Sequence, residues 1–72
     1  MTTPAKPILK VSYSTFVNIN HAYQGQGHEV VIDNKWYHIR WFLDSKFQRY
    51  YVASKLMKRS VKPLGEVKLV VV

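Results

Sequence analysis

Aromatic and cationic residues are interleaved along one part of this chain, and together they can hold a nucleic acid. Bases stack on aromatic rings, while arginine and lysine neutralise phosphates. The interleaved residues are Trp36, His38, Arg40, Arg49 and Tyr51. A basic group accompanies them in the acid-free stretch between Asp44 and Glu66, and it comprises Lys46, Lys55, Lys58, Arg59 and Lys62. These ten residues form the predicted nucleic-acid-binding site.

A hairpin with its turn at residues 43–46 would bring the interleaved residues onto one surface. This register pairs Phe42 with Phe47 and places Arg40 opposite Arg49. Successive strand residues point to opposite faces. One face then forms a core wall of Tyr37, Ile39, Trp41, Tyr50 and Val52, and the other carries Trp36, His38, Arg40, Phe42, Phe47, Arg49 and Tyr51. Opposed arginines destabilise a sheet, and a bound polyanion would remove that penalty. Alternatively, the aromatic face is a second core wall beneath the helix or the last strand.

A second hairpin independently predicts the same core face. Asp33 and Asn34 both tolerate positive φ, so they suit a two-residue turn between strands. The turn pairs Ile32 with Lys35 and Val30 with Tyr37. The side chains of Val30 and Ile32 then lie on the same face as Tyr37, which belongs to the core wall of the first hairpin.

Periodicity predicts the remaining elements. Residues 9–19 alternate apolar and polar side chains, which favours a strand with a bend near residues 12–14. A helix over residues 14–23 is the alternative. The spacing of apolar and basic residues predicts a short basic helix over 54–61, with Ser54 as its N-cap and Pro63 beyond its end. Residues 66–72 form an apolar final strand that must be central, covered or paired with another chain.

The predicted fold is mainly β. It is a small antiparallel sheet or a partly open five-stranded barrel with one short basic helix, and the alternative is an α+β fold with a three-stranded antiparallel sheet and two helices. Residues 1–7, which are polar and contain two prolines, are expected to be a disordered tail. Residues 8–72 are expected to form one small domain.

Composition limits the function classes. The 72 residues carry eleven Lys and Arg against four Asp and Glu, which gives a net charge of +7, and there is no cysteine. So short a chain leaves little room for an active-site cleft and its supporting residues, so we expect no enzyme and no cofactor. The spacing of His21, His28 and His38 matches no metal-ligand pattern. Without a signal peptide or an apolar membrane span, the chain is expected to be soluble and cytoplasmic.

The favoured function is non-catalytic binding of DNA or RNA, with no membrane partner. The alternative is a small regulator or inhibitor that binds an acidic partner protein through the same aromatic and arginine residues, because such residues often anchor interfaces. A homodimer through residues 66–72 would be a further way to cover the apolar final strand.

Overall fold

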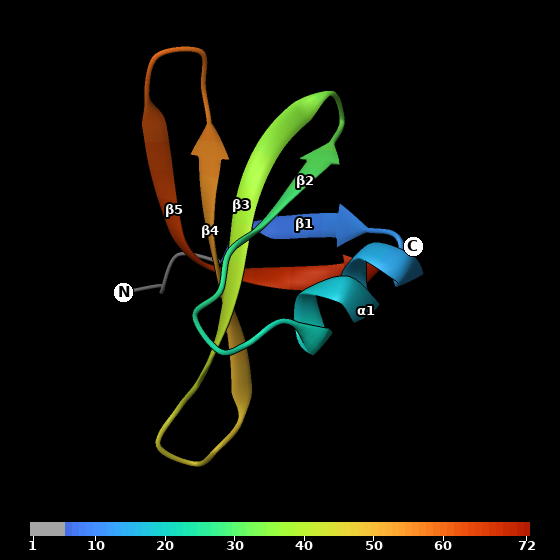
Figure 1. The fold of residues 1–72 in the computed structure, drawn as a ribbon, viewed down its shortest axis with the longest axis vertical. Helices are drawn as coiled ribbons and strands as arrows, with labels where there is room; N and C mark the ends of the chain where they lie inside the picture. The colour runs from blue at the N-terminus through green and yellow to red at the C-terminus, as the bar shows by residue number, and fades with distance from the viewer. Residues whose placement is uncertain (1–5) are drawn as a thin grey trace, which may run out of the picture.

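The computed structural model describes residues 6–72, which form one curled, half-barrel mixed sheet with a single short helix (Figure 1). The elements are β1 (Ile8–Val11), α1 (Tyr13–His21), β2 (His28–Ile32), β3 (Lys35–Leu43), β4 (Arg49–Leu56) and β5 (Val61–Val71). The strand order is β1-β5-β4-β3-β2. Neighbouring strands are antiparallel except β1 and β5, which are parallel. The predicted mainly β, partly open five-stranded architecture is confirmed.

The predicted tail is only partly within the described residues. Residues 1–5 lie outside them. The two residues that follow contact β5: the backbone N–H of Lys68 donates to the carbonyl oxygen of Pro7 at 2.9 Å, and Lys6 forms an ion pair with Glu66. Lys6 and Pro7 therefore contact the sheet.

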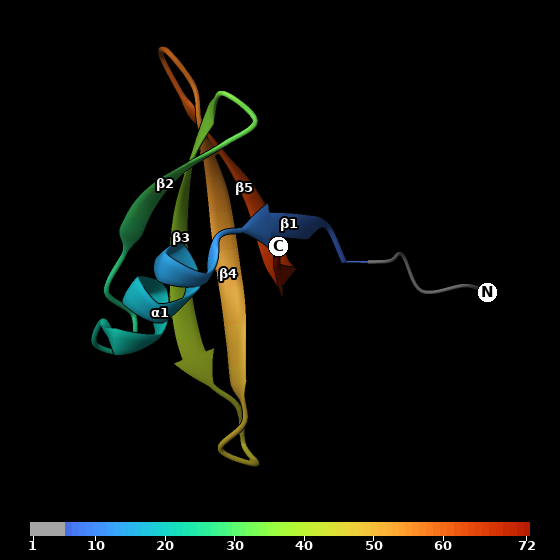
Figure 2. The same ribbon diagram turned by 90° about the vertical axis from the view of Figure 1, so that its right-hand side faces the viewer.

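The core lies between α1 and the face of the sheet that it covers, here called the inner face (Figure 2). Ile39 at the centre of the sheet is fully buried, and Ile19 of α1 is 1% exposed. The other buried core residues are Leu9, Val30, Trp41, Ala53 and Val67. The opposite face, here called the outer face, has no helix over it among the described residues.

The predicted long strand over residues 9–19 is wrong beyond Val11, because α1 begins at Tyr13. Ser12 is the N-cap, and its hydroxyl accepts a hydrogen bond from the backbone N–H of Thr15 at 3.2 Å. The alternative helix is therefore the better interpretation, although it begins and ends earlier than expected. Packing of Ile19 on the sheet outweighs the weak helix propensity of this segment.

The β2–β3 hairpin is confirmed in every predicted pair. Ile32 faces Lys35, and Val30 faces Tyr37. Asp33 and Asn34 adopt φ of 51° and 63°, which is the left-handed conformation that a tight two-residue turn requires. The core face predicted for this hairpin is therefore the inner face of the structure.

The predicted β3–β4 register is wrong. Arg40 faces Val52, three positions beyond the expected Arg49. The carboxylate of Asp44 explains the longer loop, because it accepts hydrogen bonds from the backbone N–H groups of Lys46 and Gln48 at 2.8 and 2.9 Å. An odd shift exchanges the faces of a strand. Tyr51 and Ala53 therefore face the core in place of Tyr50 and Val52.

The predicted basic helix over residues 54–61 is also wrong. β4 runs to Leu56, a turn closed by a 2.8 Å hydrogen bond from the N–H of Met57 to the carbonyl oxygen of Ser60 follows, and β5 begins at Val61. Pairing jumps from Ala53–Gly65 to Ser54–Pro63, which leaves Leu64 as a bulge. A bulge is where a strand accommodates proline. Pro63 therefore lies next to the bulge within β5 and does not end the strand.

The final strand forms the second half of β5 and lies between β1 and β4, so the central position holds among the three predicted alternatives. Glu66 and Val67 pair with β4, and residues 68–71 pair with β1. Val67 is buried and Leu69 is half-buried, whereas Val71 near the end of the strand is 42% exposed. Residues 66–71 thus already have strand partners within the chain.

Candidate nucleic-acid interface

Four apolar side chains form a continuous line across the outer face. Val31 pairs with Trp36, Trp36 with Leu56, and Leu56 with Val61. We call these four residues the apolar row. Val31 and Trp36 are both 52% exposed and Val61 is 58% exposed, so much of the row faces solvent.

His38 and Arg40 continue along the outer face of β3, away from the apolar row. His38 is half-buried and Arg40 is exposed. Further along, the rings of Phe42 and Tyr50 stack with centroids 5.8 Å apart. The predicted common face of Trp36, His38 and Arg40 is therefore correct, and Tyr50 of β4 joins this face in place of Tyr51.

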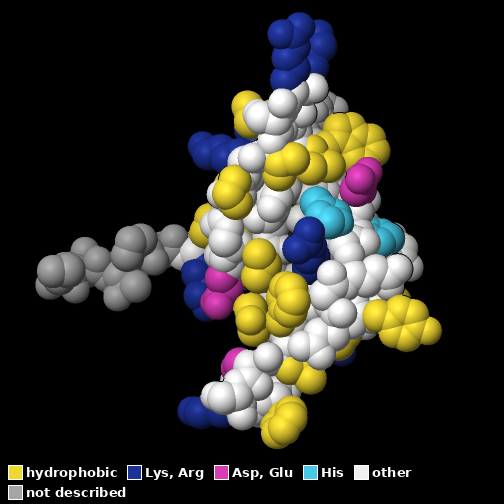
Figure 3. Space-filling view, turned by 60° about the vertical axis from the view of Figure 1, so that its left-hand side comes forward, with side chains coloured by type: hydrophobic (Ala, Val, Ile, Leu, Met, Phe, Trp, Pro, Cys, Tyr) yellow, Lys and Arg dark blue, Asp and Glu magenta, His cyan; other side chains and the backbone are white. Residues whose placement is uncertain are grey.

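Basic residues gather at the end of the sheet next to the apolar row. Lys58 and Arg59 lie in the β4–β5 turn, and Lys55 pairs with Lys62 just before it. Lys35 joins them, because it precedes Trp36 at the same end of β3. We call Lys35, Lys55, Lys58, Arg59 and Lys62 the cationic end. Figure 3 shows Lys and Arg side chains at the tip of the molecule and hydrophobic side chains directly below them.

Arg49 and Tyr51 lie on the inner face, so their predicted place beside Arg40 is wrong. The guanidinium of Arg49 lies 4.0 Å from the centroid of the Trp41 ring and donates hydrogen bonds to the backbone and side-chain oxygens of Asn20. The Tyr51 hydroxyl donates to the same Asn20 side-chain oxygen at 2.6 Å, and its ring packs 6.1 Å from that of Phe16. Both residues therefore anchor α1 to the sheet.

Trp41 strengthens the same anchor. Its indole N–H donates to the carbonyl oxygen of Ala22 at 2.9 Å. Ala22 and Asn20 lie at the C-terminal end of α1, where a helix leaves carbonyl oxygens without helical partners. A positive charge is also favoured at this end, so Arg49 has a structural role in this fold.

Lys46 lies apart from the other predicted site residues. It belongs to the β3–β4 loop, at the opposite end of β3 from Trp36. Phe47 of the same loop is 82% exposed and adopts φ of 59°. The structure thus keeps Trp36, His38 and Arg40 on the outer face and brings Lys58 and Arg59 to the turn at its end. Lys55 and Lys62 pair at the same end but on the inner-face side, because each alternates with a residue of the apolar row. Lys46, Arg49 and Tyr51 are excluded from that end and from the outer face.

Lys35 is a member of the cationic end that the sequence analysis missed. The confirmed pairing of Ile32 with Lys35 already placed Lys35 beside the Asp33–Asn34 turn. Any antiparallel partner of β3 must end near that turn, so the end of β4 had to lie close to Lys35. The signal was present in the β2–β3 register.

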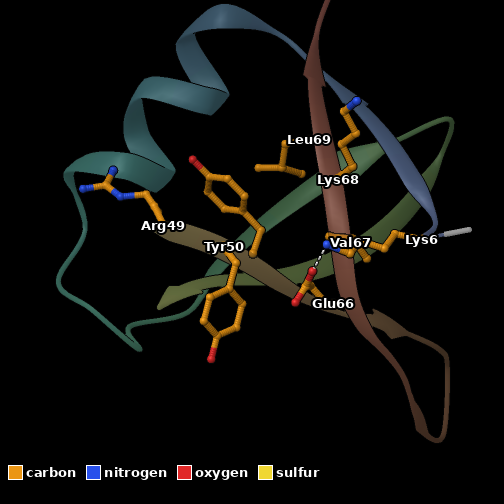
Figure 4. Close-up of a pocket in the computed structure, with 8 residues that line it drawn as sticks. Lys6, Arg49, Tyr50, Glu66, Val67, Lys68 and Leu69 are labelled. Carbon is orange, nitrogen blue, oxygen red and sulfur yellow. Dashed lines mark ion pairs between the residues drawn. The ribbon is translucent and has the colours of Figure 1, made fainter. Parts of the chain in front are cut away.

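A shallow pocket of about 230 Å³ lies where β4 and β5 diverge (Figure 4). Its lining includes Lys6, Arg49, Glu66 and Lys68. Glu66 forms an ion pair with Lys6, and Arg49 binds Asn20. Most of the charge in the pocket is therefore already engaged within the fold, and the pocket is separate from the cationic end.

Residues 6–72 hold no cluster of three or more His, Cys, Asp or Glu side chains placed to bind a metal ion. The one helix in this part of the chain, α1, is too short to cross a membrane. The chain matches no protein-family model, no curated protein and no solved structure.

The His38 ring lies against the backbone of Gly27 on the outer face. A Cβ atom at Gly27 would lie 1.4 Å from Nε2 of His38, so any side chain there must displace the ring. We expect Gly27→Ala to lower the free energy of unfolding by about 1–3 kcal/mol through this overpacking. In a His38→Ala background the same change has no ring to displace and should cost less than about 0.5 kcal/mol.

Urea unfolding of the four proteins in this double-mutant cycle measures the coupling between the two positions. Because the φ of Gly27 does not lie in the left-handed region, backbone strain does not complicate the comparison. Equal costs of Gly27→Ala in both backgrounds would show that the His38 ring does not lie against this glycine.

Proposed function

We propose that this protein is a non-catalytic nucleic-acid-binding protein that holds DNA or RNA with its cationic end and the adjoining outer face. The observation that carries the proposal is the clustering of positive charge at one end of the sheet. Five of the eleven Lys and Arg residues lie at one end, where Asp33 is the acidic residue in the adjacent turn. Such a concentration of positive charge attracts phosphates and releases their counterions.

The exposed groups next to the cationic end suit the same ligand. Trp36 offers a half-exposed indole for stacking, and Arg40 lies two rows further along the same face of β3. Arginine and aromatic side chains together contact both the backbone and the bases of a nucleic acid. The +7 net charge adds a general attraction for polyanions.

Salt dependence tests the proposal. With about four to five phosphate contacts, the log–log slope of affinity against salt should be about −3 to −5. Lys58→Ala with Arg59→Ala removes two contacts and should reduce the magnitude of the slope by about 1.4 to 1.8. Fluorescence anisotropy with labelled single- and double-stranded DNA and RNA provides the measurement.

A charge-matched variant controls for net charge. Lys10→Ala with Lys46→Ala also removes two positive charges, but these lie on β1 and in the β3–β4 loop. We expect this control to leave the slope nearly unchanged. Equal effects of the two double variants would contradict a defined site at the cationic end, and absence of binding to any of the four ligands at low salt would reject nucleic-acid binding.

An acidic partner protein is the second candidate, because the apolar row provides the charge-poor centre that protein interfaces have. Binding of an acidic protein that is lost with Trp36→Ala, together with no binding of any of the four nucleic-acid ligands, would support this function. Aromatic anchors often dominate such interfaces.

A further inference from the structure

We infer that the ligand is single-stranded and crosses the ends of the strands, with its bases on the apolar row and its phosphates at the cationic end. This inference rests on the proposed function and adds to it the strandedness, the path and the stacking residue. Trp36 is the stacking platform, and Lys58 and Arg59 of the β4–β5 turn contact the backbone.

The geometry of the sheet defines the path. Neighbouring strands are about 4.8 Å apart, so the apolar row from Val31 to Val61 is about 14 Å long. The row lies beside two chain reversals: the Ile32–Lys35 pair separates Trp36 from the Asp33–Asn34 turn, whereas Leu56 and Val61 directly flank the turn that carries Lys58 and Arg59. A strand laid along the row therefore has the sheet face on one side and the basic turn residues on the other.

The exposure of the row favours unpaired bases. In a duplex the bases are stacked and paired, and only their edges are accessible in the grooves. A duplex would therefore set its phosphates against the apolar row and would cover none of it with base surface. The bases of a single strand can turn toward the sheet, stack on the indole and bury neighbouring aliphatic side chains such as Val31 and Val61.

Trp36 is well placed to be the single stacking ring of the row. Its neighbours across the sheet are aliphatic, and 52% of its surface is exposed. The second indole, Trp41, is buried and donates a hydrogen bond to Ala22. A change in indole fluorescence when a ligand binds would thus report on Trp36.

The experiment compares three probes of equal length: an oligothymidylate, an abasic oligomer and a duplex. We expect the oligothymidylate to bind about 5- to 150-fold more tightly than the abasic oligomer and to quench the indole fluorescence. Trp36→Leu should remove the quenching and this preference, whereas Trp36→Phe should keep most of the preference. Tyr23→Leu is the matched control, because Tyr23 is 84% exposed and lies in the loop near the opposite end of β3.

Each other outcome rejects the inference. Equal affinity for all three probes without quenching would overturn it and leave the proposed function standing. Binding of vesicles with anionic lipids but of no oligomer would overturn both. The wild-type comparison of probes needs no variant, so the test remains decisive even if Trp36→Leu does not fold.

Discussion

Removing residues 68–72 is expected to leave the chain without a cooperatively folded state. These residues provide every strand partner of β1, from Ile8–Lys68 to Val11–Val71. Their loss would uncover the buried side chains of Leu9 and Val11 and remove Leu69 from the core. Burial of each such side chain contributes about 1.5–3 kcal/mol, and a 72-residue domain has a total stability of about 4–11 kcal/mol.

Thermal unfolding followed by circular dichroism, together with size-exclusion chromatography, measures the effect. Deletion of Val72 alone is the control, since this side chain is 75% exposed and its N–H makes one hydrogen bond, to Val11. We expect the control to unfold cooperatively near the wild-type temperature. A monomer lacking residues 68–72 that still melts in a sharp transition would show that β1 and β5 contribute little to the core.

Ile39→Ala is expected to lower the free energy of unfolding by about 2–5 kcal/mol. Ile39 is fully buried at the middle of β3, so the truncation removes buried methyl groups and leaves a cavity that the sheet cannot close. Such a loss takes a large part of the stability of a domain this small.

Ile8→Ala provides the matched control for that truncation. The chemical change is the same and the residue also lies in a strand, but Ile8 is 59% exposed. We expect a cost below about 1 kcal/mol, mostly from β propensity. Urea unfolding of both variants gives the comparison, and similar costs at the two positions would contradict the position of the core on the inner face.

Local chemistry was enough to predict the β2–β3 hairpin. Two adjacent residues that tolerate positive φ fix both the turn and its register, and the alternation of Val30 and Ile32 then identifies the core face. The apolar content of residues 66–72 limited that strand to a central, covered or chain-paired position, and the structure shows the central one, between β1 and β4.

The face of β4 that packs on the core was predicted wrongly, because the sequence between β3 and β4 is compatible with more than one turn length. A four-residue turn and the longer loop stabilised by Asp44 both fit the pattern of rings and charges, yet they place opposite faces of β4 on the core. The difference decided the roles of Arg49 and Tyr51. Both residues are predicted from the sequence to bind the nucleic acid, whereas in the structure both hold α1 on the sheet.

Two segments had periodicities that fitted both a helix and a strand, and only tertiary packing distinguished them. Residues 13–21 alternate like a strand but form a helix, because Ser12 caps it and Ile19 fits against the sheet. Residues 54–61 have helical spacing but form two paired strands and a turn, because β4 and β5 satisfy each other's backbone groups there.

By itself, the sequence determined that this is one basic, mainly β domain, with Trp36, His38 and Arg40 on a common face of β3. These properties follow from composition and from the two-residue period within one strand, which are local. Only the tertiary structure decided which basic residues accompany that face, because their position depends on the length of a loop and on the pairing of β4 with β5. Contacts between distant residues set both, and local patterns do not encode them uniquely.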